Sequence, residues 1–71
     1  MTPATLARIG RALHGEQWQT PLAVDLDVAD RTMRRWIAGD TPIPAGIAGE
    51  LKPLLERRIA MIREILEKLG A

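Results

Sequence analysis

The sequence predicts an all-α protein of four to five helices that folds as a single domain over residues 1–71. Three observations predict this class. The chain has 71 residues, which is close to the lower size limit for one hydrophobic core. Its apolar residues recur at the three-to-four spacing of helices. It has no cysteine, so neither disulfides nor thiolate metal sites add to that core.

The first helix is predicted from Thr2-Pro3 to about Gly15. Thr2 is a suitable N-cap, and Pro3 suits the first helical position because its missing N–H needs no partner there. The apolar residues of its core stripe recur at helical spacing: Leu6, Ile9 and Leu13.

Residues 19–38 are predicted as two short helices joined by a tight turn. Thr20 and Pro21 repeat the cap-and-proline pattern and open the first of these helices, which ends near residue 26. The second helix is predicted from about residue 29 to residue 38, and Gly39 is its C-terminal stop. The core of this region is expected to include both tryptophans, Trp18 and Trp36.

The spacing within residues 19–38 is that of a helix-turn-helix. Ala23 lies four residues after Gln19, where the first short helix must let the second come close, and Asp27 lies four residues further on, at the turn. The apolar positions of the second helix are Val28, Met33 and Trp36. At these residues and in the segment RTMRRW the chain resembles Cro-like phage-repressor-type (XRE-type) helix-turn-helix DNA-binding proteins. The resemblance covers residues 2 to about 40.

The resemblance implies a transcriptional regulator that binds double-stranded DNA in a sequence-specific way. We expect a small dimeric repressor of phage or bacterial type that reads an inverted repeat in the major groove without a cofactor. Residues 1–40 would form its DNA-reading core. Asp27 stands where such proteins usually have glycine, so we expect a positive φ there, which aspartate tolerates better than most residues.

The resemblance places the base-reading side chains at the start of helix 29–38 and one turn later. Arginine presents a planar fork that matches the edge of guanine in the major groove. Arg31 and Arg35 are four residues apart and therefore share one helix face. For Arg34, contact with a base and contact with phosphate are both open. The candidate base-reading residues are Asp30, Arg31, Thr32, Arg34 and Arg35. The alternative is a solvated face whose arginines contact only phosphate.

Asp30 has two interpretations. In the first interpretation Asp30 accepts a hydrogen bond from cytosine. In the second, which is favoured, Asp30 stabilises the first helical turn, where Ala29 is a weak cap. Arg34 lies four residues later, so an ion pair between the two is a further expectation. The candidate phosphate contacts are Arg34 and, at the start of the preceding helix, Gln19 and Thr20.

Residues 41–71 are predicted as a connector stiffened by prolines and a C-terminal helix with a break or kink near Lys52-Pro53. Beyond the proline, apolar residues follow a heptad spacing: Leu55, Ile59, Ile62, Leu66 and Leu69. This seam either packs on the N-terminal helices or forms a homodimer interface. The small size of the chain favours the dimer, whose two recognition helices would lie about 34 Å, or a multiple of that, apart.

The composition bears on the class of protein. A net charge of +1 is a weak indicator of nucleic-acid binding, but three of the ten basic residues lie within residues 31–35. The chain has one histidine and lacks serine and tyrosine, so we expect no enzyme and no metal site. The start of the chain lacks the apolar run of a signal peptide and no stretch approaches a membrane span, which favours the cytoplasm.

Two alternative functions remain open at this point. An antitoxin-type protein would autoregulate its operon and bind a toxin through its C-terminal helix. A protein-interaction module would instead use the three arginines to bind an acidic protein.

Overall fold

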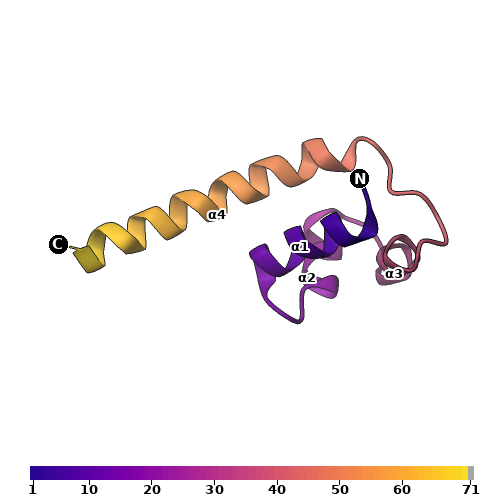
Figure 1. Ribbon diagram of the computed structural model, residues 1–71, viewed down its shortest axis with the longest axis horizontal. Coiled ribbons are helices and arrows are strands. Elements are labelled where there is room, and N and C mark those ends of the chain that lie inside the picture. The colour runs from indigo at the N-terminus through magenta and orange to yellow at the C-terminus, as the bar shows by residue number, and fades with distance from the viewer. Residues whose placement is uncertain (71) are drawn as a thin grey trace.

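The computed structural model describes residues 1–70, which form four α-helices (Figure 1). These are α1 (Pro3–His14), α2 (Gln19–Asp25), α3 (Asp30–Ala38) and α4 (Ile47–Gly70). Residues 1–70 contain no strand, so the predicted all-α class is confirmed, at the lower of the two expected helix numbers. None of these helices combines the length and apolarity that crossing a bilayer requires.

The first three helices pack against one another, and α4 packs on α1 before it runs past the end of this unit (Figure 1). Each helix contributes one large, fully buried side chain to the centre of the core: Leu6, Leu22, Met33 and Leu51. Residues 1–70 bury no polar or charged residue. The fold is therefore held by apolar contacts between all four helices.

Both tryptophans are buried, as predicted. Trp18 lies just before α2 and its ring rests against Gly10 of α1, where a Cβ atom would come within 2.1 Å of the ring. A residue without a side chain at position 10 thus lets the start of α2 lie close to α1. Trp36 belongs to α3 and is 5% exposed.

The start of α1 is capped as predicted, whereas the start of α2 is not. The backbone N–H of Thr5 donates to Oγ1 of Thr2 at 3.1 Å, and Pro3 occupies the first turn. The expectation that Thr20 caps and opens α2 is wrong, because the helix begins one residue earlier, at Gln19, directly after Trp18. Burial of Trp18 determines where this short helix starts, and no side chain caps it.

The expected break in α4 is also wrong, since the helix runs without interruption through Pro53. Proline removes a single backbone hydrogen bond, the one to the carbonyl of Gly49, and Gly49 is exposed so that water can serve this carbonyl. Core contacts on both sides of the proline offset the loss, from Ile47 and Leu51 before it to Leu54 and Leu55 after it. Tertiary packing here outweighs local preference.

The apolar seam of α4 divides in two. Leu55 is half-buried against the core, whereas the four seam residues beyond it are exposed: Ile59, Ile62, Leu66 and Leu69. The first part of the seam therefore packs on the N-terminal helices, which is one of the two predicted uses. The second part stays exposed within residues 1–70, and its use as a dimer interface stays a prediction.

Candidate nucleic-acid interface

A tight turn joins α2 to α3 and sets their relative orientation. Asp27 has a φ of 54°, as predicted, and it is the only residue other than glycine in residues 1–70 with a positive φ. The N–H of Asp27 donates to the carbonyl of Val24 at 3.1 Å, and that of Val28 donates to the carbonyl of Ala23 at 2.9 Å. These two bonds form the Schellman arrangement that closes a helix end and lets the chain reverse within a few residues.

The inner face of α3 is held by the core. Met33 and Trp36 are buried in it, and Val28 and Ile37 pack against its edge. Gly39 ends the helix in the left-handed conformation with a φ of 80°, as predicted. With one face fixed and both ends defined, the opposite face of α3 has a definite orientation toward solvent.

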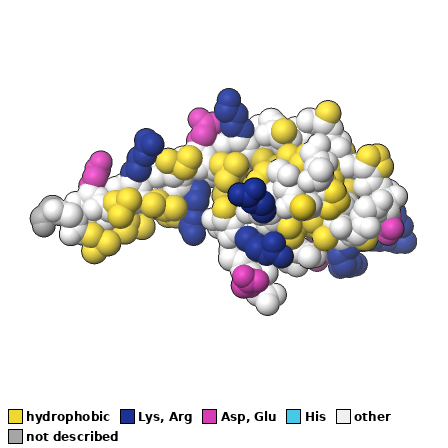
Figure 2. Space-filling model, in the orientation of Figure 1, with side chains coloured by type: hydrophobic (Ala, Val, Ile, Leu, Met, Phe, Trp, Pro, Cys, Tyr) yellow, Lys and Arg dark blue, Asp and Glu magenta, His cyan; other side chains and the backbone are white. Residues whose placement is uncertain are grey.

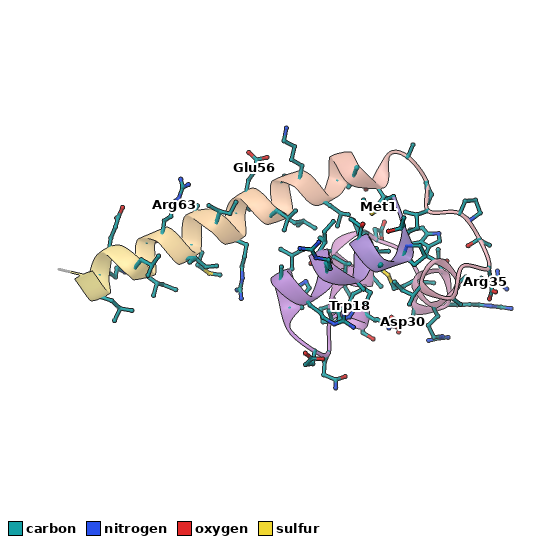
Figure 3. The ribbon with its side chains drawn as sticks, in the orientation of Figure 1. Met1, Trp18, Asp30, Arg35, Glu56 and Arg63 are labelled. Carbon is teal, nitrogen blue, oxygen red and sulfur yellow. The ribbon has the colours of Figure 1, made fainter. Side chains whose placement is uncertain are left out.

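That outer face carries three arginines. Arg31, Arg34 and Arg35 are all exposed and, at 3.6 residues per turn, lie within roughly 100° of one another around the axis. Arg35 projects away from the protein at the end opposite the C-terminus of α4 (Figure 3). Asp30 is exposed at the edge of this face, whereas Thr32 is partly buried, turned toward the core side. The structure thus brings four of the five candidate base-reading residues onto one surface.

The arginines of α3 have no carboxylate partner within residues 1–70. The two side-chain contacts of carboxylates with basic residues in this part of the chain are His14–Asp25 and Lys68–Glu64. The expected pair between Asp30 and Arg34 is therefore wrong, which accords with the few tenths of a kcal/mol that an exposed pair at this spacing contributes. Three guanidinium groups consequently remain available to an external anion or base.

Asp30 lies in the first turn of α3, and Ala29 before it provides no side-chain hydrogen bond. A carboxylate at this position interacts favourably with the helix dipole. The supporting role of Asp30 at the start of α3 stays a prediction.

The start of α2 forms a second exposed surface. Gln19 and Thr20 are both exposed, and no side chain caps the N–H groups of this first turn. The two residues help to line an open hollow together with Glu16, Gln17, Trp18 and Pro21. The carboxylate of Glu16 on this hollow weakens its attraction for an anion, so any phosphate contact here depends on the amide, the hydroxyl and the backbone N–H groups.

One polar contact of the α2 end was not expected from the sequence. Nε2 of His14 lies 2.7 Å from Oδ2 of Asp25, which ties the C-terminal end of α1 to that of α2. Their separation of 11 residues carries no local signal, because it follows from the packing of the two helices. Residues 1–70 contain no group of three potential metal-binding side chains.

Comparisons of the chain with protein-family models, with curated proteins and with solved structures found no match. α3 presents an exposed face with three arginines, while its opposite face is buried in the core.

Proposed function

We propose that the protein is a sequence-specific DNA-binding transcriptional regulator. It is a small dimeric repressor of phage or bacterial type, acts in the cytoplasm and uses no cofactor. The observation that carries this proposal is the exposed, unpaired set of Arg31, Arg34 and Arg35 on one face of α3. A helix fits the major groove of B-DNA, and arginine is the side chain best matched to guanine there.

Within this proposal the three arginines have different tasks. Arg31 and Arg35 lie one turn apart on the outermost part of the face and read neighbouring base pairs. Arg34 lies to one side of them and contacts phosphate as well as base edges. Thr32 is partly covered and contributes only at the margin of the interface, while Asp30 mainly supports the helix start.

The start of α2 positions the protein on the DNA backbone. Gln19 and Thr20 donate to phosphate oxygens, together with the uncapped N–H groups of this turn. Such contacts fix the orientation of α3 in the groove and carry no sequence information themselves.

A single α3 offers few base contacts, so a second copy is needed for a site of useful length. We assign the dimer interface to the seam of α4: Leu55, Ile59, Ile62, Leu66 and Leu69. A two-fold dimer reads an inverted repeat whose half-sites are about 10 base pairs, or a multiple of one helical turn, apart.

Selection of bound sequences from a random pool of duplex DNA tests the proposal. We expect an inverted repeat with guanines in each half-site. On that site, Arg31→Ala and Arg35→Ala should each weaken binding by about 1–3 kcal/mol, or roughly 5- to 150-fold. Arg57→Ala removes an exposed arginine from α4 instead of α3, and this control should leave the affinity unchanged.

Arg34→Ala should weaken binding to selected and random DNA alike and reduce the salt dependence by about one charge. Two results contradict the proposal. One is a pool that shows no sequence enrichment. The other is a selected site that the folded Arg31→Ala and Arg35→Ala variants bind as tightly as the wild type does.

A further inference from the structure

The last part of α4 has an apolar face that stays exposed within residues 1–70. Six large apolar side chains follow Arg58, and each is at least 45% exposed: Ile59, Met61, Ile62, Ile65, Leu66 and Leu69. Figure 2 shows hydrophobic side chains along one edge of this projecting segment and charged ones along the other. A continuous stripe of this kind on a small protein marks an interaction surface.

We propose that this stripe pairs with the same stripe of a second copy, and that the two α4 helices run antiparallel. The inference rests on the dimeric regulator proposed above and adds the orientation and register of its interface. Two observations favour this arrangement. One is the charge pattern beside the seam, and the other is the position of each three-helix unit (α1–α3) on its own α4.

The charges beside the seam distinguish the two orientations. In the heptad pattern Ile59 and Leu66 occupy a, and Ile62 occupies d, so that Glu56 and Arg63 fall at e and Arg58 falls at g. A parallel pair brings g of one helix beside e of the next heptad of the other, which places Arg58 against Arg63 twice. An antiparallel pair brings e beside e, which places Glu56 against Arg63 twice. Opposite charges therefore support the antiparallel pair.

The side chains of Glu56 and Arg63 project from the same side of α4, away from α1 (Figure 3). Both residues are exposed, and neither belongs to an ion pair within residues 1–70. They are thus available on the flank of the seam, which is where an approaching second helix passes.

The position of the domain gives the second argument. The first half of α4 lies on its own three-helix unit, where Leu51 is 1% exposed. A parallel pair brings both three-helix units to the same end of the helix pair. There each unit already covers the seam face of its own α4, which would have to meet the other α4. An antiparallel pair places the units at opposite ends, which leaves the two exposed halves free to meet.

The antiparallel pair also enlarges the interface. The exposed part of the seam, from Ile59 to Leu69, is only about 15 Å long, and a standard interface buries about 800 Å² on each partner. When Ile59 faces Ile62 of the second copy, Leu66 of the second copy comes to lie opposite Leu55. Leu55 borders a shallow apolar groove on α1, lined by Thr5, Arg8, Ile9 and Ala12. The end of the second α4 can extend the contact along this groove.

Charge reversal tests the orientation. In an antiparallel pair, Arg63→Glu places a glutamate beside Glu56 of the other copy at both contacts, so self-association should weaken at least tenfold. In a parallel pair the new glutamate lies beside Arg58 of the other copy, so self-association should strengthen. Glu56→Arg should also weaken the antiparallel dimer. An equimolar mixture of the two variants should form heterodimers of wild-type affinity, because every Glu56–Arg63 contact then joins opposite charges.

Matched controls are available on α4 outside the a, d and e positions. Arg57 and Glu64 lie seven residues apart, as Glu56 and Arg63 do, but occupy f positions away from the seam. Arg57→Glu and Glu64→Arg make the same changes in charge and should leave the dimer constant, measured by analytical ultracentrifugation, unchanged.

A distance measurement provides an independent test. The chain has no cysteine, so Lys68→Cys provides a single site for a spin label. In the proposed register the two labels are offset by about 22 Å along the helix axis, whereas parallel helices bring them to about 10 Å. Replacing both Ile62 and Leu66 with glutamate should give a folded monomer, because neither side chain belongs to the core.

Three results overturn the inference: a wild-type chain that light scattering shows to be monomeric at micromolar concentration, stronger association of Arg63→Glu, or a label separation near 10 Å. All of these measurements are made without DNA. An antiparallel dimer that selects no DNA sequence would refute the proposed function alone. A monomer that binds DNA specifically would refute this inference. The exposed seam would then be a binding surface for a different protein.

Discussion

Replacement of Gly10 by alanine tests the packing that positions α2. In an ordinary helix interior this change stabilises a protein by about 1 kcal/mol, because alanine is the better helix former. Here the added methyl group would lie 2.1 Å from Cε3 of Trp18 and 2.4 Å from Cδ2. These atoms belong to a ring that is 3% exposed and has little room to move.

The two effects have opposite signs, and their sizes decide the result. Overpacking of a core costs typically about 1–3 kcal/mol, and a contact this short requires a shift of the whole indole ring. The cost also includes displacement of the start of α2, which follows Trp18 directly. We therefore expect Gly10→Ala to lower the free energy of unfolding by about 1–2 kcal/mol, despite the gain in helix propensity.

Gly49→Ala is the matched control for Gly10→Ala. Gly49 also lies inside a helix, but no atom would come within 4 Å of its added Cβ. This variant should gain about 0.5–1 kcal/mol. Urea unfolding followed by tryptophan fluorescence measures both changes. If Gly10→Ala is stabilised as much as Gly49→Ala, Trp18 does not pack on α1 as described.

Three further predictions concern the core, the turn and the His14–Asp25 pair. Trp36→Ala should lose about 3–5 kcal/mol, a large part of the roughly 5–15 kcal/mol of a small domain, and an unchanged melting temperature would place Trp36 outside the core. Asp27→Val should lose about 1–2 kcal/mol in urea unfolding because a β-branched residue resists a φ of 54°, whereas Asp27→Asn should remain near wild type. His14→Ala should cost under about 1 kcal/mol, since the pair is partly exposed; a loss above 2 kcal/mol in thermal unfolding contradicts this.

Features decided within a few residues could be predicted from the sequence. The Thr2 cap, the positive φ of Asp27 and the end of α3 at Gly39 all depend on local sterics and local hydrogen bonds. The buried face of α3 followed from its apolar spacing, and so did the position of its arginines on the opposite face. The assignment of these arginines to DNA stays a prediction.

Features decided by packing or solvation could not be predicted in this way. The helix continues through Pro53 because core contacts hold both of its sides, and such contacts leave no local mark in the sequence. The start of α2 depends on burial of Trp18 against Gly10, which are eight residues apart. The division of the α4 seam depends on where the three-helix unit ends in space. The regular spacing from Leu55 to Leu69 therefore gives no sign that Leu55 is half-buried and the later residues are exposed.

The proposed reading face on α3 and the proposed pairing face on α4 lie at opposite ends of a molecule 48 Å long (Figure 1). In an antiparallel pair, a shift of one heptad changes the separation of the two domains by about 10 Å, or roughly three base pairs. One such shift also replaces the Glu56–Arg63 contacts with a contact between the two copies of Arg63. The charges that select the register would therefore also select the half-site spacing. Hence the double variant Glu56→Arg, Arg63→Glu, which keeps opposite charges in contact, should bind the same inverted repeat as the wild type with unchanged spacing.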